Sequence, residues 1–427
     1  MDRDRRLAFL ILKEISSKGT WSNLAVKDAL SSQKASSEAF VRELVYGCIR
    51  NQKLLDFNID RFLRSPRLKT AERVLLRMGF FQLALMDGVA DHAAVNETVA
   101  LASAFMKGRQ GFINAVLRSF QRDGKRLLDD GCAVRYSCAD WIERLWTKAY
   151  GPECAEEFMK ASCRPAPFTI RANTVRISRD ALAERLRALG LEAEYGKLSE
   201  RCLTVKGGGA LDTEEYKNGL FSVQGEASAN AVELLAPLPG ESVLDLCAAP
   251  GGKTCAAAEM MEDRGRIAAF DVYAHRAELI KKEAERLGHG IIVTGTMDAS
   301  VFEPSLEGLW DAVIADVPCS GLGTLSRNPE IKLREMSPGE AEKYIAELAL
   351  TQREILKNAA RYVKEGGRIL YSTCTVDLFE NEQITEGFIS EHPGYSIEKQ
   401  QQIYPSEYGP DGFYSCVIRR SDDKHRL

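Results

Sequence analysis

The chain has 427 residues, which is too long for a single compact core, so two or three domains are expected. Its composition, 45% hydrophobic and 28% charged, is typical of globular proteins, and no apolar run approaches the roughly 20 residues that a membrane helix needs. The 11 cysteines form no CxxC pair and the five histidines lie away from them, which argues against a zinc site or a disulfide framework. We therefore expect no metal, no membrane partner and a monomer in a reducing cytoplasm.

The charge is unevenly distributed. The net charge is −4, but residues 1–130 hold 22 lysines and arginines against 15 acidic residues, a balance of +7, so the remainder carries −11. A basic front part indicates a polyanionic partner, although ordinary variation of surface charge would also produce this imbalance.

Residues 1–130 are predicted to form an all-helical domain. The runs LAFLILKEI, VLLRMGFFQLALM and AAVNETVALASAF show helical apolar spacing, and glycines punctuate them. Acidic residues interrupt the apolar start of the chain, which favours a helix there over a signal peptide. The last segment, GFINAVLRSFQRDGKR, predicts a helix whose exposed side is rich in arginine.

Residues 131–222 are predicted to form a helical connector followed by a small α+β domain. The stretch 141–162 is helical in pattern, with a break at Gly151 and Pro152. After it, PFTIRANTVRIS alternates like a strand, ALAERLRALG is an amphipathic helix, and CLTVKGGG and LFSVQG are strand-like.

Residues 223–427 are predicted to form a doubly wound α/β domain with a parallel sheet. Five short apolar stretches read as strands: ESVLDL, GRIAAFDV, IIVTGTMD, WDAVIADV and GGRILYST. Amphipathic helical stretches separate most of them, which is the pattern of repeated β-α-β units. In such sheets the fourth and fifth strands neighbour each other beyond the first.

The loop VLDLCAAPGGKT follows the first of these strands and predicts a ligand site. It is not a phosphate loop, because Cys247 occupies the position that would need glycine, and the dinucleotide pattern G-x-G-x-x-G is absent as well. Its small residues let a ligand lie against bare backbone at a helix N-terminus. They are Ala248, Ala249, Gly251 and Gly252.

Two acids complete this site. Asp271 ends the second strand, where a carboxylate suits two ribose hydroxyls, and Asp298 ends the third, where an adenine amino group would lie. A nucleoside held without phosphates indicates S-adenosylmethionine as the cofactor. A structural loop that binds no nucleotide is the alternative.

Two cysteines follow separate strands. Cys319, in ADVPCSGLGT, comes after the fourth strand and Cys374, in YSTCTV, after the fifth. Since ligands of open α/β sheets sit at the carboxyl ends of the strands, we expect both thiols and Asp316 to face one pocket beside the cofactor. Either cysteine alone could instead be an inert apolar filler.

Methylation of a pyrimidine at C5 is the chemistry that requires a thiol there. A thiolate that adds to C6 makes C5 nucleophilic, and a carboxyl such as Asp316 can assist at N3. The C5 proton must leave afterwards, and a second thiol could accept it. The spacing does not decide which of Cys319 and Cys374 attacks.

These motifs resemble those of the bacterial 16S ribosomal RNA (cytosine-5)-methyltransferases of the Sun/Fmu (RsmB) type. The resemblance rests on DLCAAPGGKT, on DVPCSGLGT followed by RNPEIK, on YSTCTV followed by FENEQI, and on the flanking VQGEASANAVELL and DGFYSCVIRR. FVRELVYGCIRNQ, HAAVNETVALA and GFINAVLRSF resemble the NusB-type RNA-binding helical domain of this subgroup. The departures are minor: Gly225 replaces a usual aspartate, and DGFY replaces DGFF.

The resemblance implies a Rossmann-like class I methyltransferase domain in which Cys374 is the nucleophile and Cys319 assists product release. It also implies which residues contact S-adenosylmethionine: Cys247, Ala248, Ala249, Pro250, Gly251, Gly252, Lys253, Asp271, Asp298 and Asp316.

The expected partner is 16S ribosomal RNA, with the target cytosine single-stranded or flipped out of its stack. Phosphate contacts are predicted for arginines of the helical domain, and two residues of IRANT are expected to line the approach to the pocket, although each arginine could equally be a solvated surface side chain. The residues are Arg42, Arg50, Arg118, Arg122, Arg126, Arg171 and Asn173.

Three alternatives stay open. The enzyme could methylate another RNA such as transfer RNA, or it could be an RNA-binding assembly factor with a vestigial methyltransferase domain. DNA methylation is less favoured, because it would leave the thiol of YSTCTV unexplained.

Overall fold

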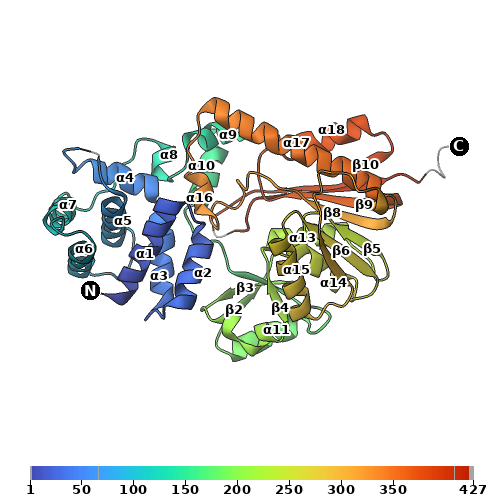
Figure 1. Cartoon of the computed structure of the whole chain (residues 1–427), viewed down its shortest axis with the longest axis horizontal. Coiled ribbons are helices and arrows are strands. Elements are labelled where there is room, and N and C mark those ends of the chain that lie inside the picture. Colours follow the sequence, from blue (N-terminus) through green and yellow to red (C-terminus); the bar gives the residue numbers. More distant parts are fainter. Residues whose placement is uncertain (1, 66, 408, 423–427) are drawn as a thin grey trace. The chain divides into compact units, whose positions relative to one another are not determined.

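The computed structural model describes residues 2–65, 67–407 and 409–422, and the chain forms two compact units (Figure 1). The helical unit comprises Met1–Pro165 and Leu325–Ser337, and the sheet unit comprises Ala166–Thr324 and Pro338–Leu427. Among the described residues, no helix is both long enough and apolar enough to span a bilayer.

In the described residues of the helical unit, every regular element is a helix, as predicted for residues 1–130. The helices are α1 (Arg3–Lys18), α2 (Ser22–Ser32), α3 (Glu38–Arg50), α4 (Gln52–Asp60), α5 (Thr70–Ala84), α6 (Asp91–Phe105), α7 (Gln110–Arg122), α8 (Cys132–Arg135), α9 (Asp140–Tyr150), α10 (Pro152–Ala161) and α16 (Pro329–Lys332). The side chain of Asp2 caps α1 by accepting the Arg5 N–H at 2.8 Å. The rings of Phe80 and Phe120 stack in the core, with their centroids 4.0 Å apart.

The segment 325–337 joins this unit although it directly follows the Cys319 loop in sequence. Lys332 of α16 is fully buried, and its Nζ donates to the Tyr136 carbonyl at 2.9 Å and to Ser162 Oγ at 3.1 Å. The Trp141 indole N–H donates to the Arg334 carbonyl at 2.7 Å. These bonds satisfy the buried ammonium and tie the segment to α8, α9 and α10.

The sheet unit begins with the small α+β domain, residues 166–223. Its antiparallel sheet has the strand order β2-β3-β1-β4. The elements are β1 (Thr169–Ala172), α11 (Arg179–Ala188), β2 (Glu192–Tyr195), β3 (Cys202–Lys206), η1 (Ala210–Asp212), α12 (Glu214–Lys217) and β4 (Phe221–Val223).

The large α/β domain follows, with a seven-stranded sheet in the order β10-β11-β9-β8-β5-β6-β7. The five predicted strands are parallel, and β8 lies between β5 and β9, as predicted. The strands are β5 (Ser242–Asp245), β6 (Arg266–Asp271), β7 (Ile292–Thr296), β8 (Trp310–Asp316), β9 (Val363–Thr373), β10 (Tyr395–Ile403) and β11 (Phe413–Arg420). The antiparallel pair β10 and β11 was not predicted, because β10 is an edge strand rich in glutamine that lacks an apolar run.

Helices cover both faces of this sheet (Figure 1). They are α13 (Glu226–Leu235), α14 (Gly252–Met260), α15 (Ala274–Leu287), α17 (Pro338–Tyr362) and α18 (Glu382–Glu391), with the short η2 (Pro304–Leu306). Alternate residues of each strand enter two separate cores: Val243 packs with α13 and α14, and its neighbour Leu244 packs with α17. A sheet that is apolar on both faces explains the continuous apolar runs seen in the sequence.

Candidate active site

Two cysteines meet at the carboxyl edge of the large sheet. β8 and β9 are parallel neighbours, with Asp316 paired to Ser372, so the segments that follow them leave the sheet side by side. The Sγ atoms of Cys319 and Cys374 lie 3.3 Å apart. The fold thus brings together two thiols that are 55 positions apart in the chain.

The contact affects the ionisation of the Cys319 thiol. Hydrogen bonding to Cys374, reinforced by burial, raises the pKa of the Cys319 thiol well above its ordinary value. Cys319 therefore keeps its proton at neutral pH, and either sulfur can be the donor in the contact between them.

A buried polar network holds the segment that carries Cys319. The Ser320 N–H donates to Glu380 Oε2 at 2.8 Å, and the Gln352 amide donates to the same oxygen and to the Pro318 carbonyl, both at 2.9 Å. Glu380 is fully buried, and this burial raises its pKa. Sequence reasoning missed Glu380 and Gln352, and the one available signal was the place of Glu380 in FENEQI.

The two thiol segments are also bonded directly to each other. The Gly323 N–H donates to the Cys374 carbonyl at 3.0 Å, and the Gly412 N–H donates to the Gly323 carbonyl at 2.8 Å. A Cβ at position 323 would lie 2.0 Å from the Gly412 carbonyl oxygen, so only glycine permits this close approach of the backbones.

Asp377 lies in the same network, and we expect its substitution by asparagine to stabilise the protein more at pH 8 than at pH 4. Burial, together with the charge of Glu380, raises the pKa of Asp377 to about 7. Below about pH 4 the carboxyl is protonated in both the folded and the unfolded chain. Between about pH 4 and pH 7 only the unfolded chain ionises, so stability declines through this window, by up to about 4 kcal/mol.

Asparagine imitates the protonated carboxyl and removes this cost. The measurement is the difference in melting temperature between Asp377→Asn and the parent protein, taken from pH 4 to pH 8. An equal difference at both ends of the range would contradict the expected ionisation of Asp377.

Asp316, at the end of β8, contacts both the start of α14 and the end of β9. Its Oδ2 lies 2.7 Å from Nζ of Lys253, and its Oδ1 accepts the Ser372 hydroxyl at 2.7 Å. Lys253 is nearly buried, and its ammonium lies 4.9 Å from the centre of the Phe413 ring. The ion pair therefore connects the start of α14 with the end of β8 in a partly desolvated setting.

The predicted cofactor loop connects β5 to α14. Gly251 has φ of +110°, and a Cβ there would lie 3.2 Å from Cα of Ile280, so the tight turn into α14 requires glycine. The peptide bond between Ala249 and Pro250 is cis. Ala248 is buried and its N–H donates to the Phe270 carbonyl at 2.8 Å, which places the loop beside the end of β6.

The acids around this loop fit a ligand that carries donor groups. Asp245, at the end of β5, accepts the Thr254 hydroxyl on Oδ2 at 2.7 Å, while its buried Oδ1 has no hydrogen-bond partner among the described residues. Burial raises the pKa of Asp245 to about 7. Asp271 is buried at the end of β6, 3.3 Å from the guanidinium of Arg276. An orphaned acceptor and a strand-end carboxylate suit the ammonium and ribose hydroxyls of an amino-acid nucleoside.

Two further residues predicted to contact the cofactor, Asp298 and Cys247, have different surroundings from Asp245 and Asp271. Asp298 is exposed after β7, and its Oδ1 accepts the N–H of Ser300 at 2.9 Å and its hydroxyl at 2.6 Å. Burial raises the pKa of Cys247, so this thiol is neutral. No group of three or more histidine, cysteine or acidic side chains able to hold a metal occurs in the described part of the chain.

The residues predicted to contact RNA divide into two groups. Arg171 and Asn173 are fully buried, so they do not line an approach to a pocket, contrary to the expectation. Both bond within the sheet unit: Arg171 with Glu259, and Asn173 with the carbonyls of Gly219 and Leu287.

Of the five arginines of the helical unit that were predicted to contact RNA, four are exposed. Arg50 is the exception, because it is only 9% exposed and its guanidinium donates to the Ser326 carbonyl. Arg42 is exposed beside Glu38. Arg118, Arg122 and Arg126 are exposed on and just after α7.

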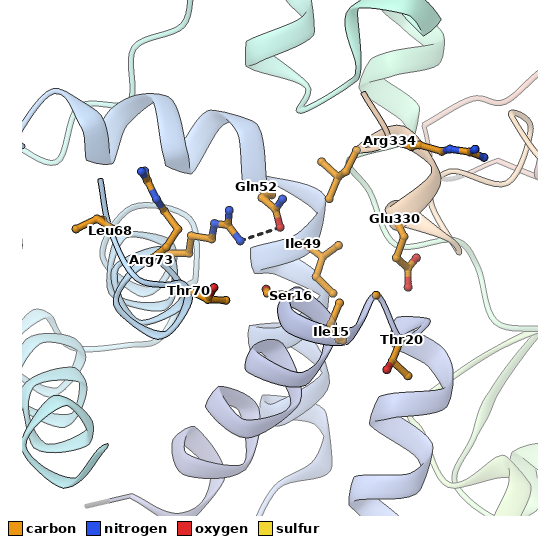
Figure 2. A pocket seen from close by; sticks show the side chains of 13 residues that line it. Ile15, Ser16, Thr20, Ile49, Gln52, Leu68, Thr70, Arg73, Glu330 and Arg334 are labelled. Atoms are coloured by element: carbon orange, nitrogen blue, oxygen red, sulfur yellow. Dashed lines mark hydrogen bonds between the residues drawn. The ribbon is translucent and has the colours of Figure 1, made fainter. Parts of the chain in front are cut away.

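The helical unit contains a pocket with a volume of about 440 Å³. Residues of α1, α3, α4, α5 and α16 line it (Figure 2). Acids already balance two of its arginines: Arg77 donates to both carboxylate oxygens of Asp56, at 2.8 and 2.6 Å, and Arg73 donates to Asp60 at 2.6 Å. Its lining includes none of the predicted catalytic or cofactor residues. The pocket is therefore separate from the predicted site at the edge of the large sheet.

Three family models match successive parts of the chain. Residues 2–122 match the NusB family, and residues 139–212 match a ferredoxin-like domain of RsmF/B-like methyltransferases. Residues 232–419 match a model described as 16S rRNA methyltransferase RsmB/F.

Relatives align over nearly the whole chain. A "Probable ribosomal RNA small subunit methyltransferase B" of Bacillus subtilis is 34% identical, covering 97% of this chain and 98% of the relative. A protein of the same name from Synechocystis is 33% identical, covering 98% and 99%. The "Ribosomal RNA small subunit methyltransferase B" of Proteus mirabilis is 29% identical, covering 97% and 98%.

Two solved structures are similar to this chain in fold and in sequence. The crystal structure of a protein named PH0851 superposes with a TM-score of 0.80 at 26% identity, covering 98% of this chain and 99% of that one. A methyltransferase homologue from Pyrococcus horikoshii reaches 0.56 at 26% identity, covering 66% of this chain and 99% of that one.

Proposed function

Because the chain belongs to the RsmB/RsmF family of 16S rRNA methyltransferases, we propose that it methylates carbon 5 of a cytosine, with Cys374 as the nucleophile. The enzyme depends on S-adenosylmethionine, which supplies the methyl group as an electrophilic sulfonium when it is bound. The observation that carries the proposal is the 3.3 Å separation of Cys319 and Cys374 at the strand ends that also hold Asp316.

Carbon 5 of cytosine is too weak a nucleophile to be methylated directly. A thiolate that adds to C6 raises the electron density at C5 and divides one difficult step into easier ones. We assign this addition to Cys374, as the resemblance of its motif to the family's implies, and the raised pKa of the Cys319 thiol, which keeps its proton, supports this choice.

Cys319 acts second, as the base that removes the C5 proton. The contact with Cys374 is the largest cause of its raised pKa. Once Cys374 is bonded to C6, its sulfur is a neutral thioether and a weak acceptor, so the pKa of Cys319 falls and this thiol can release its proton to water. The resulting thiolate takes the C5 proton, the C5–C6 double bond reforms, and Cys374 leaves as a thiolate.

The Asp316–Lys253 pair assists at the polar edge of the cytosine. Asp316 is held by Lys253 and Ser372, so as a carboxylate it accepts a hydrogen bond from the base, and the adjacent Lys253 ammonium supplies a proton for N3. Sequence reasoning placed Lys253 only in the cofactor loop, and the ion pair extends its role to the substrate.

The cofactor contacts are proposed for the loop Cys247–Lys253 and for the acids that surround it. Asp271 is positioned for the ribose hydroxyls, and the unpartnered Oδ1 of Asp245 is available to the ammonium group. Asp298 lies at the neighbouring strand end for the adenine. Asp245 is an addition to the set predicted from the sequence.

We propose that the target cytosine is single-stranded or flipped, since C6 is not accessible within a base stack. Both thiols must be reduced for the reaction, and in the described residues all 11 cysteines are unpaired. A reducing compartment, the cytoplasm, meets this requirement.

The arginines of α7 are proposed to contact RNA phosphates. Replacing Arg118, Arg122 and Arg126 by glutamine should weaken RNA binding at low salt and reduce the slope of log affinity against log salt by about one for each phosphate that is no longer neutralised. The measurement is a salt titration of RNA affinity. Arg264→Gln is the control, because Arg264 precedes β6 at the edge of the sheet opposite the thiols. An unchanged slope in the triple variant would contradict the proposed contact surface.

The decisive experiment is to incubate the enzyme with labelled S-adenosylmethionine and small-subunit ribosomal RNA, both naked and in partly assembled particles, and to locate the modified base. We expect 5-methylcytosine at a defined position. Label at another atom would overturn the proposed chemistry. Label in transfer RNA alone, or cofactor binding without any transfer, would favour the alternatives of a different RNA substrate or an assembly factor.

A further inference from the structure

Arg171 is a fully buried cation that belongs to the small α+β domain but bonds to the large α/β domain. It lies on β1, and its Nε and one terminal nitrogen donate to the two carboxylate oxygens of Glu259 at 2.7 and 2.8 Å. The other terminal nitrogen donates to the Gly252 carbonyl at 2.9 Å and to the Gln224 side chain. All five donors of a guanidinium point in fixed directions, so this set of bonds specifies one geometry.

The partners of Arg171 lie at the two ends of one helix. α14 runs from Gly252 to Met260, so a single guanidinium contacts both its first residue and its last turn. Gly252 is also the point at which the cofactor loop ends, and Lys253, the next residue, holds Asp316. The orientation of α14 therefore determines the position of the loop and of the Lys253 ammonium.

Stability alone does not account for this arrangement. A buried ion pair is about as stable as a well-packed apolar pair of the same volume, or less stable, because both charges lose their hydration. Burial alone would raise the pKa of Glu259, and the opposing charge of Arg171 lowers it, so both groups are ionised. An apolar pair would fill the same space, but it could not donate to the Gly252 carbonyl.

Other bonds already attach the two domains to each other. Asn173 donates to the Leu287 carbonyl at 2.9 Å, Ser222 donates to Glu283 at 2.7 Å, and Arg286 donates to the Phe221 carbonyl at 3.1 Å. These bonds reach α15 and not the cofactor loop. Arg171 differs from these interdomain contacts because it bonds to Gly252, at the start of α14.

We propose that Arg171 is a positioning residue, through which the small α+β domain holds the start of α14 in the orientation that binds S-adenosylmethionine and directs Lys253 towards Asp316. The small domain then has a role in catalysis in addition to any contact with RNA. This inference rests on the cofactor loop assigned under the proposed function.

Two variants separate positioning from charge balance. Arg171→Lys retains a positive charge opposite Glu259 but lacks the fork that also reaches Gly252. Arg171→Met combined with Glu259→Gln removes both charges of the pair together, so neither residue is left as an unpaired ion. Ser222→Ala is the matched control, because it removes an interdomain hydrogen bond that does not touch the loop.

The measurements are the melting temperature, the Kd for S-adenosylmethionine by calorimetry, and KM for the cofactor and for RNA. We expect both Arg171 variants to fold, with Kd and KM for the cofactor raised by about tenfold or more and KM for RNA changed by less than about threefold. Ser222→Ala should bind the cofactor like the parent.

Cofactor affinity equal to the parent's in either folded variant would overturn the inference. Failure of Arg171→Lys to fold would overturn it as well, because Arg171 would then be required for stability. If the parent enzyme itself did not bind S-adenosylmethionine, the proposed function would fail instead, so the two failures are distinguishable.

Discussion

The Cys374→Ala variant is expected to lose methyl transfer entirely, with kcat reduced by more than about 10⁴-fold. Without the sulfur no adduct forms at C6, and C5 is not nucleophilic enough to be methylated. Because Cys374 lies in a loop after β9 and its neighbouring Thr373 and Thr375 are bonded to other groups, the substitution should leave the fold intact. The measurement is transfer of labelled methyl groups to small-subunit RNA under single-turnover conditions.

Two controls make this result specific. Cys154→Ala removes an exposed thiol of α10 and should leave transfer unchanged. Cofactor affinity of the Cys374 variant should stay close to that of the parent, since the loop and its acids are untouched. Full turnover by Cys374→Ala would show that the nucleophile has been misassigned.

The Cys319→Ala variant should behave differently and accumulate a covalent complex between protein and RNA. Addition at C6 and methylation at C5 do not require Cys319, but removal of the C5 proton does. Turnover should fall by about 10²–10⁴-fold, the usual contribution of a general base. The complex is detected as a band of low mobility that survives denaturant and disappears on treatment with ribonuclease.

The double variant Cys374→Ala, Cys319→Ala supplies the control, because it should form no complex. A complex that forms in Cys374→Ala but not in Cys319→Ala would exchange the roles of the two thiols. Rapid turnover without an adduct in Cys319→Ala would assign the base to another group, and the buried Glu380, which bonds to Ser320, would be the next to test.

The meeting of Cys319 and Cys374 could be predicted because strand order follows from local patterns. The apolar runs before Cys319 and Cys374 identify two buried parallel strands, and the usual order of such sheets makes these strands neighbours. Parallel neighbours end at the same edge, so their following residues meet. The separation of 3.3 Å between the sulfurs, and the raised pKa of the Cys319 thiol, could be found only from the side-chain positions.

Arg171 and Asn173 show where residue type misleads. An arginine in a short polar motif suggests a surface contact with phosphate. The neighbouring sequence does not indicate that Glu259, 88 positions later, forms an ion pair with Arg171. A buried charge is recognisable only when its partner is known, and that partner comes from a different domain. The burial of Arg50 was missed for a similar reason, because its guanidinium donates to the carbonyl of Ser326, which is far away in the sequence.

Glu380, Gln352 and Lys332 were missed for a related reason. Each forms a hydrogen bond with a group far away in the sequence. Glu380 accepts the Ser320 N–H, Gln352 donates to the Pro318 carbonyl, and Lys332 donates to the Tyr136 carbonyl. No periodicity marks such residues, because their partners are set by the packing of whole elements and not by the local chain.

The amino-acid sequence alone was sufficient for the helical front, the small α+β domain, the parallel sheet, the position of the glycine-containing loop after β5 and the meeting of the two thiols, because each depends on short-range patterns of apolar spacing, small residues and strand ends. The three-dimensional fold alone decided which charges are buried, that residues 325–337 join the helical unit, and which groups surround each thiol. Those features depend on contacts between segments that are distant in the chain. A local sequence pattern does not show which distant segments come into contact in the folded protein.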